Sequence, residues 1–306
     1  MEINLSDTPH STGTPSAELI IDTLLVRRLL LEQHSDLQDL QIDFLDAGWD
    51  NTIFRLGKKL CVRLPRREAA AKLIENEQTW LLTLAKQLNL PVPAPVRIGR
   101  PTTYYPWKWS ILPWFDGVAA DIEEPEIDQA EHFSLFLRSL HRPAPANAPF
   151  NPVRGVPLIQ RSVFIEQRIK NLTKKINLIE PKINSIWQQA LKSPFDVETK
   201  WLHGDLHPRN ILVDGGRISA IIDWGDITSG DIATDLASIW MLFSQQNARQ
   251  RVIKEYGDIS EATLQRAKGW AVFFAVVLID TGLVNAPRQV KIGKKILNNL
   301  TEDFRY

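Results

Sequence analysis

Residues 201–235 decide the fold, and they read WLHGDLHPRNILVDGGRISAIIDWGDITSGDIATD. Asp205 and Asn210 lie on a loop that leads into a short apolar strand. The turn Asp214-Gly215-Gly216 predicts a tight hairpin, and Asp223 ends its return strand. Because the open ends of a hairpin lie side by side, we expect these three oxygen-bearing side chains to converge at one end of it.

This set of oxygen donors favours chemistry with a divalent cation. Mg2+ takes oxygen ligands and keeps waters and substrate phosphates around it, so an asparagine and an aspartate form a suitable pair. Asn210 and Asp223 are therefore the predicted metal ligands. Asp205 is then available as a base.

The same stretch resembles the signature of a known family. The run from His203 to Asn210, with Asp223-Trp224-Gly225 after it, is similar to the catalytic segment of aminoglycoside phosphotransferase-like antibiotic kinases, which are relatives of protein kinases. The kinase pattern H-R-D-x-x-x-x-N followed by a metal-binding Asp matches at His203, Asp205, Asn210 and Asp223. The resemblance implies that Asp205 receives or orients the substrate hydroxyl proton. It also implies that Asn210 and Asp223 hold Mg2+, and that His207 helps to neutralise the transferring phosphoryl group.

The order of predicted elements agrees with an α+β, two-lobed, protein-kinase-like fold. Short strands and one long helix dominate before Gly117, and helical patterns dominate after it. We therefore expect a small antiparallel-sheet, nucleotide-binding lobe with a leading helix at residues 1–116. A larger, mainly helical catalytic and substrate-binding lobe is expected at 117–306.

Hydrophobic periodicity and turn residues give the boundaries of these elements. The predicted strands are Gln41–Leu45, Asn51–Leu56, Lys59–Leu64, Pro95–Gly99 and Trp107–Leu112. The predicted helices are Pro15–Gln33, Arg67–Leu88, Glu126–Leu140, Pro157–Asn177, Lys182–Leu191, Asp231–Gln245, Ser260–Asp280 and Pro287–Leu300.

One ion pair is expected inside the N-terminal lobe. Strand alternation places Arg63 on the opposite face from Val62 and Leu64. Glu77 lies four residues from both Leu73 and Leu81, on the apolar stripe of its helix, where a carboxylate needs a cation. Arg63 and Glu77 are thus predicted partners. By the resemblance they occupy the places of the kinase strand lysine and its helix glutamate, with arginine replacing the lysine.

The resemblance also implies a nucleotide site for ATP or GTP. Gly48 lies in the turn where kinases cover the phosphates. In the segment WSILPWFDG, residues 109–117, Leu112 would line the adenine pocket, and the backbone of Pro113 and Phe115 would bind the base edge.

Other polar residues near the motif allow structural or functional interpretations. Asp235 resembles a helix aspartate that fixes the catalytic-loop backbone, and His203 is expected to brace that loop by hydrogen bonding. Asp226 and Asp231 could face a cationic or hydroxylated substrate, or Asp231 could cap its helix.

Composition limits the classes of partner. Lysine plus arginine equals aspartate plus glutamate at 36 each, and 44% of residues are apolar. This balance is typical of a folded globular protein and argues against a dedicated nucleic-acid or anionic-membrane binder. The single cysteine, Cys61, the polar start of the chain and the short apolar run Trp270–Ile279 favour a cytoplasmic protein with no membrane span. Nothing in the sequence indicates an obligate protein partner.

Three functions stay open at this point. The leading hypothesis is a kinase that transfers the γ-phosphoryl group of ATP or GTP to a small-molecule hydroxyl, on either an antibiotic, macrolide or aminoglycoside, or a housekeeping metabolite. The second is a metal-dependent hydrolase that binds zinc through the run His203-x-Asp205-x-His207. The third is a nucleotide-binding regulator without catalysis.

Overall fold

The computed structural model describes residues 16–176 and 181–304. These residues form two compact units. The N-terminal unit holds residues 16–116 together with 220–225, and the helical unit holds 117–219 and 226–304. Each unit has its own layers and its own core.

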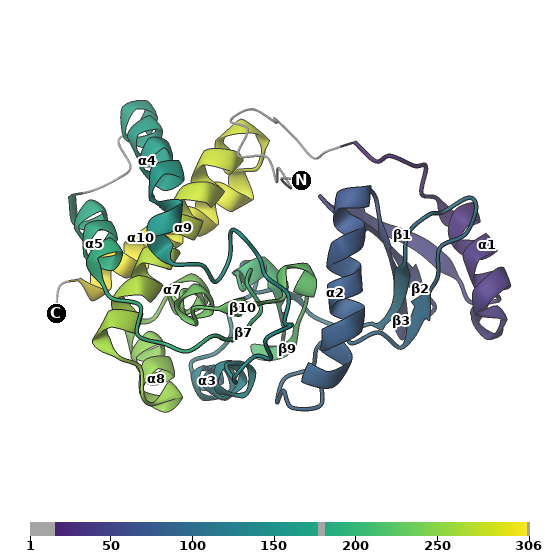
Figure 1. The fold of residues 1–306 in the computed structure, drawn as a ribbon, viewed down its shortest axis with the longest axis horizontal. Helices are drawn as coiled ribbons and strands as arrows, with labels where there is room; N and C mark the ends of the chain where they lie inside the picture. Colours follow the sequence, from purple (N-terminus) through teal and green to yellow (C-terminus); the bar gives the residue numbers. More distant parts are fainter. Residues whose placement is uncertain (1–15, 177–180, 305–306) are drawn as a thin grey trace. The chain divides into compact units, whose positions relative to one another are not determined.

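The N-terminal unit contains one antiparallel sheet with a helix on each face (Figure 1). Its strands lie in the order β1-β2-β3-β5-β4. Their bounds are Ile42–Ala47 for β1, Asn51–Leu56 for β2, Leu60–Pro65 for β3, Trp109–Pro113 for β5 and Arg97–Gly99 for β4. The helices are α1, Thr23–Gln33, and α2, Glu68–Leu84, and a short 3-10 turn spans Ser35–Leu37.

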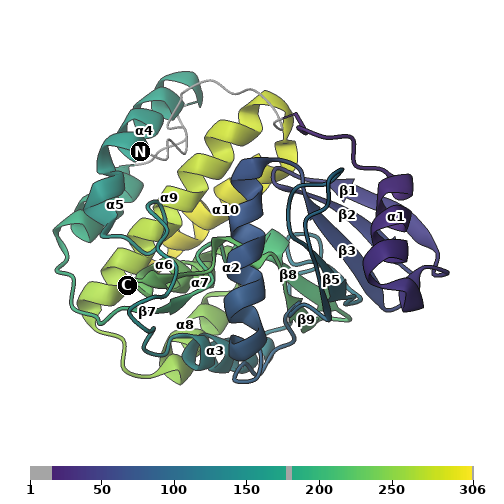
Figure 2. The same cartoon turned by 45° about the vertical axis from the view of Figure 1, so that its right-hand side comes forward.

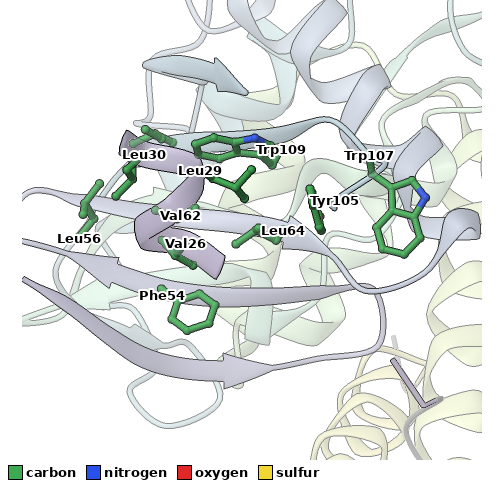
Figure 3. Close-up of a cluster of buried hydrophobic side chains, with 11 residues drawn as sticks. Val26, Leu29, Leu30, Phe54, Leu56, Val62, Leu64, Tyr105, Trp107 and Trp109 are labelled. Atoms are coloured by element: carbon green, nitrogen blue, oxygen red, sulfur yellow. The ribbon is translucent and has the colours of Figure 1, made fainter. Parts of the chain in front are cut away.

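An apolar core joins α1 to one face of this sheet (Figure 3). Val26, Leu29 and Leu30 of α1 lie in the same cluster as alternate residues of the strands, among them Val62 and Leu64. Tyr105, Trp107 and Trp109 extend the cluster along the sheet. Because side chains alternate along a strand, Arg63 is left for the opposite face, where α2 packs.

The first helix begins later than the sequence predicted. It starts at Thr23, and the described residues before it, 16–22, are not helical; Pro15 lies outside the described residues. The Asp22 side chain accepts a hydrogen bond from Leu25 N at 2.8 Å and so caps the helix. Glu18 N instead donates to the carbonyl of Arg66, which ties the preceding segment to the end of β3.

The helical unit consists mainly of helices that pack around a long central one, α9 (Figure 2). The helices are α3 (Gln129–Leu140), α4 (Ser162–Ile176), α5 (Pro181–Lys192), α6 (Ala233–Leu236), α7 (Ser238–Leu242), α8 (Gln246–Tyr256), α9 (Glu261–Asn285) and α10 (Pro287–Asp303). Short 3-10 turns cover Leu158–Arg161, Pro208–Asn210 and Trp224–Asp226. The strands are β6 (Val118–Ala119), β7 (Lys200–Leu202), β8 (Ile211–Asp214), β9 (Arg217–Ile221) and β10 (Thr228–Gly230). Residues 220–225, which include the end of β9 and the start of the last turn, belong to the N-terminal unit.

The predicted hairpin is present as β8 and β9. Gly215 and Gly216 form its turn with φ angles of 55° and 77°, a region that favours glycine. β6 pairs with the outer edge of β8, and β7 pairs with β10 in a separate two-stranded sheet.

One predicted helix is divided in the structure, and one observed helix was not predicted. The predicted helix Asp231–Gln245 is divided into the short helices α6 and α7. The helix α8, whose sequence QNARQRVIKEY is largely polar, was not predicted because it carries few apolar residues to mark a face.

Among the described residues, one helix is long and apolar enough to cross a membrane by length and composition alone. This stretch, Glu261–Val284 of α9, is longer than the run Trp270–Ile279 on which the sequence prediction rested. However, 67% of its most apolar window is buried inside the protein, as in the core helix of a folded domain.

Candidate active site

The catalytic-loop backbone in the helical unit is fixed by Asp235. This buried carboxylate on α6 accepts hydrogen bonds from His203 N at 2.7 Å and from Gly204 N at 2.9 Å. Gly204 has a φ of 86°, and a Cβ there would lie 2.5 Å from the carbonyl oxygen of Asp226. The predicted bracing role of Asp235 is therefore confirmed.

His141 contacts the Asp235 carboxylate and is itself contacted by Tyr256. His141 Nε2 lies 3.5 Å from the Asp235 carboxylate, and His141 Nδ1 lies 2.9 Å from the Tyr256 hydroxyl of α8. Burial, together with the negative charge of Asp235, raises the pKa of Tyr256, so the phenol stays neutral. Sequence patterns could not predict this arrangement, because the three residues are far apart along the chain.

The Asp205 carboxylate is engaged at both oxygens. Oδ1 accepts a hydrogen bond from Arg154 Nη2 at 3.1 Å, and Oδ2 lies 3.4 Å from His207 Nε2. Burial raises the pKa of Asp205, but the neighbouring His207 and Arg154 more than offset this, so its pKa lies below the ordinary value. Asp205 is thus an ionised carboxylate, as a proton acceptor requires.

The remaining loop residues orient Asp205 and Asn210. His203 Nδ1 accepts from Asp205 N at 3.2 Å, which is the bracing contact expected of His203. Asn210 Nδ2 donates to the Asp205 carbonyl at 2.9 Å. That bond uses the amide nitrogen and leaves the Asn210 side-chain oxygen as the atom suited to a hard cation.

Arg154 was not predicted as a site residue. It lies in the proline-rich connection between α3 and α4, which has no periodicity to indicate an inward-facing side chain. One signal was the glycine beside it: Gly155 has a φ of 69°, and its N–H and carbonyl bind Thr234 Oγ1 and Asp231 N. These bonds fix the connection against α6 and so hold Arg154 at Asp205.

In the N-terminal unit, the predicted Arg63–Glu77 ion pair is present. Arg63 Nη1 lies 2.7 Å from Glu77 Oε1, and both side chains are almost fully buried. Arg63 Nη2 also lies 2.7 Å from Asp223 Oδ1. In the amide orientation that satisfies both groups, the Asn51 oxygen accepts from Arg63 Nη2 and Nε at 2.8 and 3.0 Å. Arg63 therefore joins β2, α2 and the segment after β9.

Asp223 combines this contact with a special backbone. Its φ is 61°, and no other non-glycine residue in the described part of the chain has a positive φ. Its side chain is 55% exposed, and Arg63 contacts only Oδ1. The carboxylate oxygens of Asp223 and the amide oxygen of Asn210 are hard donors. Mg2+ prefers such oxygen ligands.

The other predicted nucleotide residues lie around the same sheet. Gly48 is in the turn between β1 and β2, where its N–H donates to the Asn51 carbonyl at 2.9 Å and its carbonyl accepts from Arg66. Leu112 and Pro113 end β5, where they pair with β3, and Phe115 follows as a half-buried side chain. Their contact with a nucleotide stays a prediction.

Asp231 does not face a substrate. Its carboxylate is fully buried, binds Arg266 Nε and Nη2 at 2.7 and 3.2 Å, and accepts from Ala233 N at 3.1 Å. Asp226 accepts a hydrogen bond from Asn151 Nδ2 at 2.7 Å. The substrate-facing interpretation of Asp231 was wrong, because the arginine that neutralises it lies 35 positions away in the sequence.

A zinc centre at the His-x-Asp-x-His run finds no support. Across residues 16–176 and 181–304, no group of three His, Cys, Asp or Glu side chains is arranged to hold a metal. His203 Nδ1 instead accepts the Asp205 backbone N–H.

Solved structures of antibiotic kinases share this fold. A GDP complex of wild-type aminoglycoside 2'-phosphotransferase-IIIa matches with a TM-score of 0.64 and 17% identity over 92% of this chain and 98% of that one. A macrolide 2'-phosphotransferase type I matches with a TM-score of 0.60 and 19% identity over 91% and 99%. The chain therefore has the predicted α+β, protein-kinase-like fold.

The sequence identifies the family. Residues 41–270 match the model of the phosphotransferase enzyme family, and the chain belongs to that family. It is also 27% identical over 132 residues to an aminoglycoside 3'-phosphotransferase of Salmonella typhimurium, a match that covers 40% of this chain and 47% of that protein. The chain thus aligns with about half the length of the curated relatives it matches.

Proposed function

We propose that the protein is a small-molecule kinase that transfers the γ-phosphoryl group of ATP or GTP to a substrate hydroxyl. The observation that carries this proposal is the position of the Asp205 carboxylate, which Arg154 contacts, on a loop whose backbone Asp235 fixes. Phosphoryl transfer depends mainly on positioning and charge neutralisation, and a fixed acceptor of the hydroxyl proton supplies the first.

The proposed step uses one nucleotide and one alcohol. The acceptor oxygen forms a bond to the γ-phosphorus while the bond from that phosphorus to the bridging oxygen of the nucleoside diphosphate breaks. The hydroxyl proton passes to Asp205, and the products are a phosphate monoester and the nucleoside diphosphate. His207, 3.4 Å from Asp205, is proposed to help neutralise the transferring group.

Asn210 and Asp223 are the proposed ligands of Mg2+, which when bound would neutralise charge on the phosphates. Arg63 is proposed to act near the nucleotide mainly by holding Asp223 and Glu77. Four hydrogen bonds to Glu77, Asp223 and Asn51 use most of the donors of its guanidinium. Gly48, Leu112, Pro113 and Phe115 remain the proposed contacts for ATP or GTP.

The acceptor is proposed to be a hydroxylated small molecule. Relatives with aminoglycoside and macrolide phosphotransferase names support an antibiotic, and a housekeeping metabolite is the second candidate. Screening the purified protein with Mg-ATP and Mg-GTP against both groups of compounds would identify the acceptor and the donor.

The variant Asp205→Ala tests the mechanism. Loss of a general base is expected to lower turnover by about a hundredfold to ten-thousandfold. Nucleotide affinity, measured by calorimetry, is expected to stay unchanged. The matched control Asp258→Ala removes an exposed carboxylate from a loop of the helical unit and should keep full activity. Wild-type turnover in Asp205→Ala would refute the proposed role. Nucleotide binding without transfer to any acceptor would favour the regulator hypothesis instead.

A further inference from the structure

Three elements that are far apart in the sequence meet near the catalytic loop of the helical unit. The helices α3 and α8 pack side by side, and α3 also contacts β7 (Figure 2). The strand β7 leads directly into the loop, which begins at His203. Trp201 N of β7 donates a hydrogen bond at 2.9 Å to the carbonyl of Arg142, which is the residue after His141. His141, which follows α3, is therefore held beside the loop.

A chain of polar groups connects α8 to the loop through His141. The hydroxyl of Tyr256, the last residue of α8, lies 2.9 Å from His141 Nδ1. On the other side of the ring, His141 Nε2 lies 3.5 Å from Asp235 Oδ2. The same Asp235 oxygen accepts the hydrogen bond from His203 N, and Oδ1 accepts from Gly204 N. The imidazole ring therefore contacts the carboxylate that fixes the loop backbone.

The contact between this ring and this carboxylate is shielded from water. The side chains of His141 and Asp235 are 1% and 0% exposed. Within residues 16–176 and 181–304, His141 Nε2 makes no hydrogen bond, and it approaches the Asp235 carboxylate at 3.5 Å. Electrostatic interactions are stronger in a buried environment of this kind than in water. The energy of the Asp235 carboxylate therefore depends on whether Nε2 presents a hydrogen or a lone pair to it.

Two interactions favour a hydrogen on Nε2. Burial and the charge of Asp235 raise the pKa of Tyr256, so its phenol keeps a hydrogen to donate to His141 Nδ1. A neutral imidazole has one N–H, so a hydrogen bond accepted at Nδ1 leaves that hydrogen on Nε2. With the opposite arrangement, the Nε2 lone pair would face the negative charge of Asp235, which is unfavourable in a buried site.

We propose that Tyr256 and His141 are positioning residues for the catalytic loop. The Tyr256 hydroxyl fixes the His141 ring with its hydrogen on Nε2, and this hydrogen keeps the Asp235 carboxylate aligned with the two loop amides that it binds. This inference rests on the proposed kinase function, because Asp205 is the group that the loop positions. Neither residue is catalytic, since each acts through Asp235. Their removal should therefore lower turnover and leave the KM values unchanged.

Nitrogen NMR of the full chain with 15N-labelled histidine tests the state of the ring without an activity assay. The chemical shift of each ring nitrogen depends on whether it carries a hydrogen, and the variant His141→Gln identifies the His141 signals by their loss. We expect the wild-type ring to carry its hydrogen on Nε2 and to accept a hydrogen bond at Nδ1. A hydrogen on Nδ1, in either a neutral or a cationic ring, would refute the role of Tyr256 as the donor.

Hydrogen exchange of the loop amides tests whether the ring supports the loop. Tyr256→Phe keeps the aromatic ring and removes the hydroxyl, so the amides of His203 and Gly204 should exchange about threefold to tenfold faster. Amides of α9 should keep their wild-type rates. The control Tyr104→Phe removes a hydroxyl that binds Glu32 in the N-terminal unit and should change neither loop amide. Unchanged exchange at both amides in Tyr256→Phe, or an equal increase throughout the helical unit, would overturn the proposal.

Two substitutions at His141 test which ring atom acts. A glutamine amide nitrogen reaches about as far from the backbone as Nε2, whereas an asparagine reaches only about as far as Nδ1. His141→Gln should keep turnover within about threefold of wild type, and His141→Asn should lower it by about tenfold to a hundredfold. Tyr256→Phe should lower it by about threefold to tenfold, with unchanged KM values in all three variants. Equal turnover in His141→Gln and His141→Asn would refute the role of Nε2.

These measurements separate the inference from the proposed function. Turnover can be measured as hydrolysis of Mg-ATP or Mg-GTP by water, which needs no identified acceptor, and melting curves show whether each variant is folded. Wild-type turnover in Tyr256→Phe and His141→Asn, with activity lost in Asp205→Ala, would leave the kinase function standing and overturn the positioning roles. Absence of any phosphoryl transfer would contradict the kinase function, whereas the NMR and exchange results would still decide whether Tyr256 and His141 support the loop.

Discussion

Two arginine–carboxylate pairs, one in each unit, differ in how completely protein groups surround them. Arg63 and Glu77 have side chains that are 6% and 3% exposed, and Arg63 also binds Asp223 and Asn51. Arg154 and Asp205 are 18% and 21% exposed, and Arg154 keeps one buried N–H without a partner. The first pair is fixed by its surroundings. The second is only partly enclosed by the protein, so solvent reaches both of its side chains.

The buried pair should show the largest effect on stability. Burial opposes the charge on Arg63, but Glu77 and Asp223 raise the pKa of the guanidinium, so it stays charged. Glu77→Ala would leave this buried charge without its main partner and should lower the free energy of unfolding by about 3–5 kcal/mol. Urea denaturation would measure this. The control is Glu75→Ala, which removes a more exposed carboxylate from the same helix. An equal loss of stability in both variants would contradict the special contribution of the buried pair.

A smaller loss of stability is expected for a substitution that keeps the positive charge at position 63 but removes the planar guanidinium. Arg63→Lys can retain the ion pair with Glu77, but one ammonium cannot reproduce the contacts to Asp223 and Asn51. The free energy of unfolding should fall by about 1–3 kcal/mol. Hydrogen exchange at residues 221–225 should become faster. A variant with wild-type exchange there would show that Arg63 does not hold Asp223.

The half-buried carboxylate of Glu124 should make the free energy of unfolding depend on pH. Burial raises the pKa of Glu124, but hydrogen bonds from Ser244 and the charge of Lys295 outweigh this and hold it below the ordinary value of about 4.3. A lowered folded pKa adds stability above the unfolded pKa, and that stability is lost as pH falls through the folded pKa. We expect a loss of less than about 1 kcal/mol below pH 4.

The comparison of Glu124→Gln with wild type over the acid range would measure this contribution. The variant should unfold with a weaker dependence on pH in that window, because it lacks the titrating group. Identical pH dependence in the two proteins would rule out a contribution from Glu124.

The exposed pair Arg251–Glu131 should show the smallest effect. Its side chains are 41% and 49% exposed, so water and salt screen the 2.7 Å contact. Arg251→Gln should change the free energy of unfolding by no more than about 0.5 kcal/mol, as measured by urea denaturation. A loss comparable to that of Glu77→Ala would contradict the link between burial and the strength of these pairs.

The sequence could predict contacts that local periodicity determines. Strand alternation at Arg63 and helical spacing at Glu77 were sufficient for their ion pair, because each pattern specifies a face. The kinase-like spacing likewise pointed to Asp235 as the support of the catalytic loop. Sequence patterns could not predict contacts between residues that are separated by long connections. Arg154 lies 51 positions before Asp205, within a segment that has no period.

Helix ends and breaks were predicted less well for a related reason. The apolar residues Leu19 and Ile20 continued the helical pattern, but the Asp22 cap sets the start of α1. The sequence left open whether Asp231 faces a substrate or caps its helix, because its partner Arg266 belongs to a distant helix. At Asp22 a single polar interaction outweighed the hydrophobic pattern, whereas at Asp231 the partner lay too far along the chain to be inferred.

The backbone at Asp223 restricts how this position can evolve. A φ of 61° is tolerated by glycine, asparagine and aspartate, whereas longer or branched side chains are strained there. If the carboxylate is also needed to bind a cation, glutamate would keep the charge but would not suit the backbone. Among random replacements, asparagine and glycine should therefore yield folded but inactive proteins. Aspartate alone satisfies both demands, so neutral drift at this codon should be nearly absent.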